Sequence, residues 1–566
     1  MKFFACGLRA FLLCGALASA QSTSPVDAGA LPASQPAESI TVFHASSHLV
    51  VVNVVVTDRD GNPVAGLDRD DFQLLEDGRT QQLQVFEPHV PAKQLVAVPE
   101  VQLAPNEYSN SAKQAPGSAV NVILFDILNT PTNDQMYARQ QMIDFLKTLP
   151  RGQRVALFTL GTSLKMIAGF TTNTDDLIAA ANKLRPGLSP YLDTEEDLEA
   201  EDHLNRQLHA GLSPSNAVGG GFSMSDAMSD FAQETRLVRT DIRVDKTFEG
   251  LGALARALSG YAGRKNLLWL SEAFPATVLP SVQSARPDYR NYLAIFQKYS
   301  GLLESSQISV YPIDIRGLKN TSLPPIGGDP EFHSTGRQND EMVGSQLTMR
   351  DVAEETGGRA YYNTNDLKGA LQRSIEHGST YYTLAYVPQN HDWNGNFRRI
   401  KVLVQRNGVK LDYRQGYYAI RDDPSPADAA RRMLIAEMQP GVPESTMLSL
   451  KVKVVSASSK TGNVNIDYGV NAPDISFTGD PVKHAKLEFV AVAWDKNNKA
   501  AGDVSETMDL DLKPETFRRV LNAGVPAHQQ LTLKPGTYKL RLGVMDYSNS
   551  KIGTLEVPVT VAANHP

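Results

Sequence analysis

The sequence predicts a multidomain protein of α/β plus all-β class, with a central α/β domain whose sheet is mainly parallel. Three observations predict this arrangement. An apolar strand, Val120 to Phe125, is followed by alternating strand and helix patterns as far as Asp422. Short alternating strands bounded by turn residues occur on both sides of that region. The length of 566 residues suits about three domains.

The first residues have the pattern of a secretory signal. Lys2 introduces an apolar run that ends in small residues at Ala20, so residues 1–20 are predicted to be a signal peptide. A lipid anchor on Cys14 is the alternative. Cys6 and Cys14 are the only cysteines, so the exported chain would have no disulfide and would depend on its cores for stability. We therefore expect an exported protein, periplasmic or extracellular.

Composition argues against two classes of partner. The net charge is −7 and the basic residues are scattered, so we expect no nucleic-acid partner. No apolar run after the signal reaches the roughly 18 residues that a membrane span requires, so we expect no transmembrane segment in the mature chain.

An N-terminal β-rich module is predicted for residues 39–110, after a flexible linker at 21–38 that is rich in Ser, Pro and Ala. Its first strand is Leu49 to Thr57. Acidic and amide residues alternate from Asp58 to Asn62 like the start of a calcium loop, but the glycine comes too early, so a turn is predicted.

The α/β domain is predicted to span residues 116–422, with a polar insertion at 186–240 and a second loop at 317–344. Its last strands are predicted to form a hairpin, Arg399–Val404 with Val409–Tyr413. The other predicted elements are helix Asn133–Leu149, strands Val155–Leu160 and Lys165–Phe170, helices Thr174–Leu184 and Asp245–Tyr261, strand Asn266–Leu270, helix Tyr289–Leu303, strand Ile308–Ile313, helix Met349–Thr356, strand Arg359–Tyr362, helix Asp366–Glu376 and strand Tyr381–Tyr386.

The C-terminal part is predicted to be an immunoglobulin-like β-sandwich over residues 446–563. A linker at 423–445 with one short helix precedes it. The predicted strands are Ser449–Val455, Val464–Tyr468, Ala485–Trp494, His528–Leu533, Gly536–Asp546 and Gly553–Val561.

Polar residues follow the first apolar strand of the α/β domain, at the sheet edge where open α/β sheets bind ligands. Asp126, Asn129 and Thr130 lie there, with Leu128 between them. This segment resembles the first strand and metal-site loop of the von Willebrand factor A (VWA) family, a Rossmann-like fold, whose pattern is Asp-x-Ser-x-Ser. Leu128 replaces the middle serine.

The resemblance implies a divalent cation, such as Mg²⁺, whose open coordination place accepts an acidic side chain of a protein partner. By the same resemblance Glu272 takes the place of an aspartate on another loop, and either Thr240 or Thr247 serves the remaining loop. The predicted metal residues are Asp126, Asn129, Thr130, Thr247 and Glu272.

Leu128 lacks the hydroxyl of the serine it replaces, and the Glu272 side chain is longer than that of aspartate. We therefore expect this site to be degenerate and any cation to bind weakly. The alternative is that Asp126 and Thr130 cap the next helix while Glu272 is solvated.

The wider resemblance is to exported bacterial VWFA-related proteins. It is carried by Val64–Leu67, Asp77-Gly78, Gly263–Asn266 and Gly416–Tyr418, and implies a fold rather than a ligand.

No zincin, nucleophile-elbow or phosphate-loop motif is found, so no catalytic or cofactor-binding residue is predicted. We expect a non-enzymatic protein-binding or adhesion protein. The alternatives are a structural envelope scaffold with a metal-independent VWA fold, and a hydrolase with an unfamiliar site.

Overall fold

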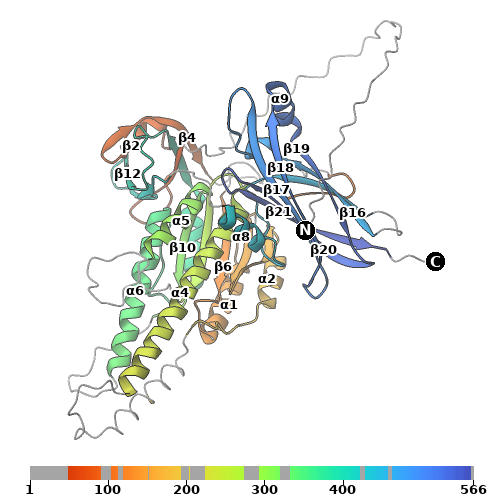
Figure 1. Cartoon of the computed structure of the whole chain (residues 1–566). Helices are drawn as coiled ribbons and strands as arrows, with labels where there is room; N and C mark the ends of the chain where they lie inside the picture. The colour runs from red at the N-terminus through yellow and green to blue at the C-terminus, as the bar shows by residue number, and fades with distance from the viewer. Residues whose placement is uncertain are drawn as a thin grey trace, which may run out of the picture. The chain divides into compact units, whose positions relative to one another are not determined.

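A computed structural model describes residues 49–90, 103–111, 119–150, 152–192, 203, 224–272, 292–318, 332–420, 427–456 and 462–562 (Figure 1). These residues form a mixed α/β structure with several sheets. The predicted signal peptide and the linker at 21–38 lie outside the described residues. Among the described helices, none has both the length and the apolar character needed to cross a membrane.

The α/β part contains a five-stranded sheet of order β10-β9-β6-β7-β8. Its first four strands are parallel, as predicted, and β8 is antiparallel at one edge. All residues of β6, β7, β9 and β10 are buried, because helices cover both faces. The strands are β6 (Val120–Asp126), β7 (Val155–Leu160), β8 (Leu164–Thr171), β9 (Lys265–Ser271) and β10 (Ile308–Asp314).

Alternate residues of β6 enter two separate cores. Ile123 and Phe125 pack with α1 (Thr132–Leu146), α2 (Thr174–Lys183) and α7 (Leu367–Ser379). Val122 and Leu124 point to the opposite face. That face is covered by α4 (Met224–Leu258), α5 (Leu293–Ser305) and α6 (Phe332–Thr356).

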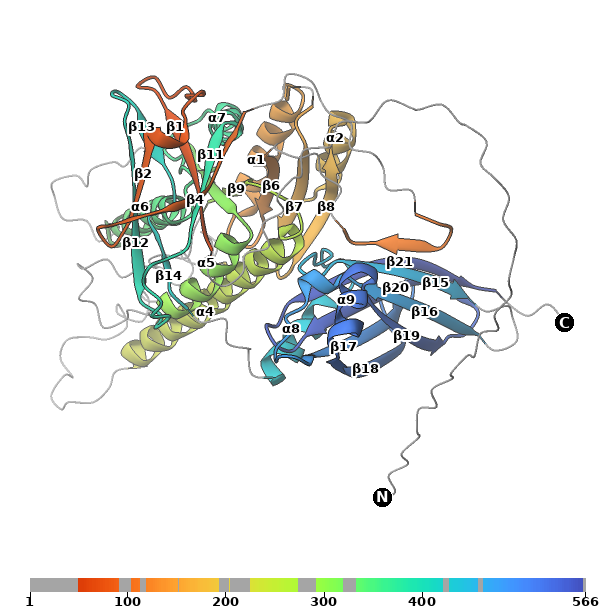
Figure 2. The same ribbon diagram turned by 90° about the horizontal axis from the view of Figure 1, so that it is seen from above.

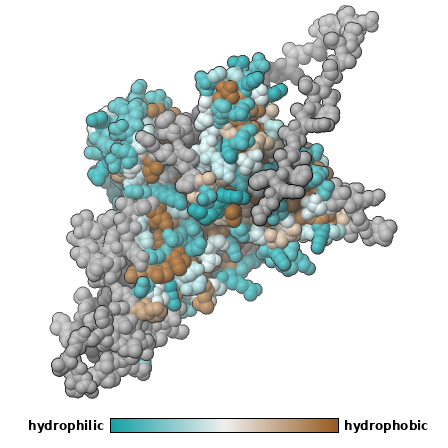
Figure 3. Space-filling view, in the orientation of Figure 1, coloured by the Kyte–Doolittle hydropathy of each residue, from teal (hydrophilic) through white to brown (hydrophobic). Residues whose placement is uncertain are grey.

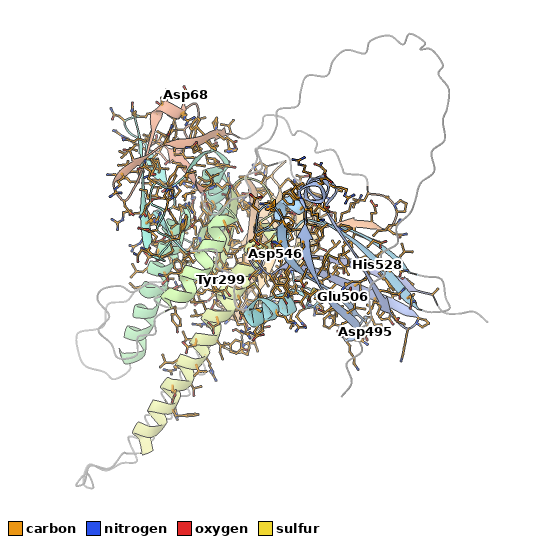
Figure 4. All side chains as sticks on the ribbon, turned by 45° about the horizontal axis from the view of Figure 1, so that its top comes forward. Asp68, Tyr299, Asp495, Glu506, His528 and Asp546 are labelled. Atoms are coloured by element: carbon orange, nitrogen blue, oxygen red, sulfur yellow. The ribbon has the colours of Figure 1, made fainter. Side chains whose placement is uncertain are left out.

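The ring of Tyr299, labelled in Figure 4, stacks on Phe248 with ring centroids 5.9 Å apart, which joins α5 to α4.

Two helices are longer than the sequence predicted. Helix α4 begins at Met224 rather than Asp245, so the predicted insertion at 186–240 is wrong for its last part. Helix α6 begins at Phe332, within the predicted second loop. Polar composition excludes a core layer but not an exposed helix, and no proline or glycine interrupts α4 before Gly250. The middle of the insertion, at 193–202 and 204–223, lies outside the described residues.

The N-terminal module is built from strands on both sides of the α/β part. Its two four-stranded sheets have the orders β13-β1-β11-β4 and β14-β12-β2-β3. Residues 381–418, assigned from sequence to the end of the α/β domain, therefore complete sheets begun by residues 50–89. The strands are β1 (Val50–Thr57), β2 (Phe72–Glu76), β3 (Arg79–Gln81), β4 (Leu83–His89), β11 (Tyr381–Tyr386), β12 (Phe397–Val404), β13 (Lys410–Asp412) and β14 (Gly416–Tyr418).

The hairpin predicted around Gly408 is wrong. Strand β12 pairs with β2 and β14, whereas β13 pairs with β1 in the other sheet. Pairing with the N-terminal strand β2 buries Ile400 and Val402 of β12 in one core with Leu74 and Val54, whereas a local hairpin alone would leave them in water. Gly408 still makes a turn, at φ 77°.

Two four-stranded antiparallel sheets form the C-terminal β-sandwich, in the orders β19-β16-β15-β5 and β18-β17-β20-β21 (Figure 2). The predicted sandwich is confirmed; its immunoglobulin-like topology stays a prediction. Helix α8 (Ala427–Glu437) precedes it in the chain, as predicted. The elements are β5 (Glu107–Ser109), β15 (Leu450–Ser456), β16 (Asn463–Val470), β17 (Lys483–Trp494), β18 (Ala500–Leu512), α9 (Pro514–Ala523), β19 (Val525–Thr532), β20 (Gly536–Asp546) and β21 (Ile552–Val561).

Two strands of this sandwich escaped prediction or were assigned elsewhere. Strand β18 alternates exposed acidic residues such as Glu506 and Asp509 with partly buried ones. Because so many of its residues are polar, it lacks the apolar pattern from which a strand is predicted. Strand β5 was assigned to the N-terminal module, yet it pairs with β15.

Candidate functional site

The candidate site lies where the parallel strands β6 and β9 end, beside α4. Asp126 is the last residue of β6, and Ser271 is the last residue of β9. Because these strands are neighbours in the sheet, their carboxyl ends meet. Thr247 comes to the same place from α4.

The carboxylate of Asp126 is buried and accepts four hydrogen bonds. Its Oδ1 accepts from the backbone N–H of Asn129 at 3.0 Å. Its Oδ2 accepts from the Asn129 Nδ2 at 2.9 Å, from the Trp269 Nε1 at 3.0 Å and from the Ser271 Oγ at 2.9 Å. Burial raises the pKa of Asp126 above its usual value, although these donors act in the opposite direction. Three of the four donors share Oδ2, so protein groups fill that oxygen, whereas Oδ1 accepts one hydrogen bond.

The side-chain amide of Asn129 bridges two elements. Besides the bond to Asp126, its Nδ2 donates to the Thr247 Oγ1 at 2.9 Å. The Thr247 hydroxyl donates its own proton to the backbone oxygen of Arg243 at 2.8 Å, so it acts as an acceptor toward Asn129. Both neighbours of Nδ2 are thus acceptors, which fixes the orientation of the amide. The Asn129 Oδ1 is left buried without a hydrogen-bond partner.

Thr130 and Glu272 meet through the backbone. The N–H of Glu272 donates to the Thr130 Oγ1 at 3.3 Å, and the backbone oxygen of Glu272 accepts from the Ser345 Oγ of α6 at 3.5 Å. The structure therefore brings together all five predicted residues, Asp126, Asn129, Thr130, Thr247 and Glu272. Of the two threonines left open by the sequence, Thr247 contacts the loop.

The alternative that Asp126 and Thr130 cap the next helix is wrong. Helix α1 begins at Thr132 after Pro131, and no side chain accepts a hydrogen bond there as an N-cap. Leu128, at the place of the missing serine, is 1% exposed and packs in the core under α4. Its side chain is a packing group, so this position supplies no oxygen.

Sequence reasoning missed two members of the network, Trp269 and Ser271. Trp269 could have been predicted, because a buried indole N–H needs a hydrogen-bond acceptor and Asp126 ends the neighbouring strand. The strand register that pairs Leu124 with Trp269 is a tertiary feature. No local sequence pattern around Ser271 predicts that it donates to Asp126.

The oxygens at this site do not fit a divalent cation such as Mg²⁺, which takes six of them in a near-octahedral shell. The Asp126 Oδ2 already accepts three hydrogen bonds, and the hydroxyls of Thr247 and Thr130 already accept from Asn129 and from the Glu272 backbone. The amide nitrogen of Asn129 is a donor, which repels a cation, and it lies within 2.9 Å of two of the oxygens in question.

No protein-family model matches the chain, and no curated protein matches it significantly. Several solved structures resemble parts of it. An aerotolerance-related membrane protein from Bacteroides fragilis with multiple mutations to serines is 13% identical over 46% of this chain and 98% of that chain, with a TM-score of 0.22.

The conserved hypothetical protein BatB from Bacteroides thetaiotaomicron is 12% identical over 34% of this chain and 89% of its own, at a TM-score of 0.16. PilB minor pilin from Streptococcus sanguinis is 13% identical over 47% of this chain and 63% of its own, at a TM-score of 0.23. These values are too low to assign a fold family or a function, so a functional proposal has to depend on the residues of this chain alone.

Proposed function

We propose that this chain is an exported, non-enzymatic binding protein in which a VWA-like α/β domain holds a protein partner without a bound cation. The observation that carries the proposal is the buried Asp126 carboxylate, whose four hydrogen bonds come from the protein itself. A partner's acidic side chain would find no metal to ligate, so other surfaces must make the contact.

The VWA-like assignment is supported by where the polar residues lie. Asp126 ends the central strand β6, a hydroxyl residue of α4 faces it, and the end of β9 closes the site. These are the three places from which the family resemblance expects a ligand loop. The assignment is thus supported by the chain's own geometry.

The partner surface we propose is the outer part of α4 and α6. Phe231 and Val238 on α4 are 73% and 47% exposed, and their spacing of two helical turns puts them on one face. Val343 and Leu347 on α6 are exposed as well. In the space-filling view, hydrophobic residues gather over the region of these helices (Figure 3). Exposed apolar groups of this kind are typical of protein-binding surfaces.

The test is capture of partners from cell-envelope extract by the tagged full-length protein. We expect the same captured proteins in Mg²⁺ and in chelator, at least tenfold less capture by the Phe231→Asp/Val238→Asp variant, and unchanged capture by a Met166→Asp control. Met166 is 49% exposed on β8, which makes it a matched surface site. Capture that chelator abolishes would contradict the proposal.

A structural scaffold is the second candidate, and one observation favours it. Strands β5 and β11 join distant parts of the chain into shared sheets, as in a protein built to hold its modules together. Under this alternative the same experiment yields no partner that depends on Phe231 and Val238.

A further inference from the structure

We propose that the side-chain amide of Asn129 takes the place of a cation and holds β6, β9 and α4 together. The inference rests on the VWA-like site of the proposed function, but it requires no partner. It concerns the natural chain as a fixed, metal-free network rather than a weakened metal site.

The position of the amide carries the inference. The Asn129 Nδ2 lies 2.9 Å from the Asp126 Oδ2 and 2.9 Å from the Thr247 Oγ1, so one NH₂ group, whose hydrogens carry partial positive charge, joins a carboxylate on β6 to a hydroxyl on α4. A cation bound between these groups would make the same connection. All three side chains are at most 1% exposed, where a hydrogen bond to a carboxylate is strong because water does not compete.

The unpartnered oxygen of Asn129 supports the same conclusion. Leaving the buried Oδ1 without a donor has a free-energy cost, and rotating the amide by half a turn would not remove it. The rotated oxygen would face the Asp126 Oδ2 and the Thr247 Oγ1, which are both acceptors. The network tolerates one unsatisfied oxygen because the two bonds made by the nitrogen are worth more.

The rest of the network makes the arrangement rigid. Trp269 and Ser271 donate to Asp126 from β9, and the Thr247 hydroxyl is held by the Arg243 backbone oxygen. Leu128 is packed in the core, so no side chain other than Asn129 reaches between Asp126 and Thr247 in the described contacts.

The sharpest test is Asn129→Asp, which changes a nitrogen into an oxygen at nearly constant shape. The variant would place a second carboxylate beside Asp126, and like charges this close destabilise the site. We expect its melting temperature in chelator to be lower by about 5 °C or more, and Mg²⁺, Ca²⁺ or Mn²⁺ to restore most of that loss. Asn129→Ala is the matched control, which should also melt lower but should not respond to these cations.

A second pair of variants covers the case in which Asn129→Asp does not fold. Leu128→Ser adds the missing hydroxyl but keeps the amide in place, so calorimetry should detect no Mg²⁺ binding. Leu128→Ser with Asn129→Ala removes the amide and should bind Mg²⁺.

Three results would overturn the inference: Mg²⁺ binding by the natural chain that Asp126→Asn abolishes, an Asn129→Asp variant that melts like the natural protein or responds to no cation, or equal Mg²⁺ binding by the single and double Leu128 variants. None of these measurements uses a partner protein. They can therefore contradict the role of Asn129 independently of the capture experiment, which tests the proposed function.

Discussion

The two β modules of this chain reach the same kind of core by different routes. Of the eight strands described in the C-terminal sandwich, seven follow one another between Leu450 and Val561, and the short β5 comes from elsewhere. In the N-terminal module, four strands precede the α/β part and four follow it. The difference teaches that the N-terminal module cannot close until the α/β part has been made, whereas the C-terminal sandwich depends mainly on local chain order.

The largest effects should come from the two cores. Tyr382 is 1% exposed, packs against Phe72 in a tilted arrangement with ring centroids 5.0 Å apart, and donates its hydroxyl proton to the Val64 backbone oxygen. Phe489 is 2% exposed in the sandwich core. We expect Tyr382→Ala and Phe489→Ala each to cost about 3–5 kcal/mol of unfolding free energy.

Hydrogen exchange read by mass spectrometry separates the two variants. Tyr382→Ala should reduce protection in β1, β2 and β11, and Phe489→Ala in β16, β17 and β20. If both variants lose protection throughout the chain, the modules unfold as one unit and the comparison fails.

A buried carboxylate holds the N-terminal module from the inside. Glu76 is 2% exposed and accepts from the hydroxyls of Tyr386 and Tyr417 at 2.7 and 2.9 Å, with Arg398 at 3.5 Å. Glu76→Gln would leave the buried guanidinium without its counter-charge, so we expect a loss of about 3 kcal/mol. Chemical denaturation measures it, with the more exposed Glu87→Gln as control. Equal midpoints for the two variants would show that the burial of this pair is overstated.

A buried side chain at the end of β5 binds this strand to the sandwich. Asn110 is 5% exposed, donates to the backbone oxygens of Ser445 and Leu448, and accepts from the Leu450 N–H at 2.7 Å. Asn110→Ala leaves these groups unsatisfied, so we expect a loss of about 1–3 kcal/mol. Exposed Ser111→Ala is the control. Protection should fall in β15 alone, and unchanged exchange there would mean that the borrowed strand does not stabilise the sandwich.

The smallest effect concerns the α/β part between the two halves of the N-terminal module. Lys265 at the start of β9 is 2% exposed, and burial lowers its pKa to about 7. Since an unfolded lysine titrates near 10.5, the buried amine destabilises the fold fully below pH 7, and the penalty fades as pH rises toward 10.5.

Lys265→Met should therefore be stabilising at pH 7, on the order of 1 kcal/mol, because it removes a buried amine that has lost its hydration. The gain should shrink as the pH rises to 10, in melting curves recorded across this range. A difference that does not vary with pH would show that the amine is hydrated in the folded state.

The residues of the candidate site were more predictable from the sequence than the contacts among them. The apolar strand ending at Asp126 and the polar loop after it were visible in the sequence. The family resemblance grouped Asn129, Thr130 and Glu272 into one site and left Thr240 and Thr247 as alternatives for its last member. What they do to one another was not visible, because the donor that reaches Asp126 from Asn129 depends on the loop backbone. Whether the site binds a partner stays a prediction.

Local chemistry in the sequence determined which segments are strands or helices and which of their faces are apolar, since side-chain period and turn residues act over a few neighbours. Tertiary structure decided the partners. The ladder of β11 with β1 joins residues about 330 positions apart, such as Val52 and Leu384, and no local pattern encodes that choice. Pairing is decided by which apolar faces fit together once the α/β part has brought the ends of the chain near each other, and that fit is a property of the whole fold.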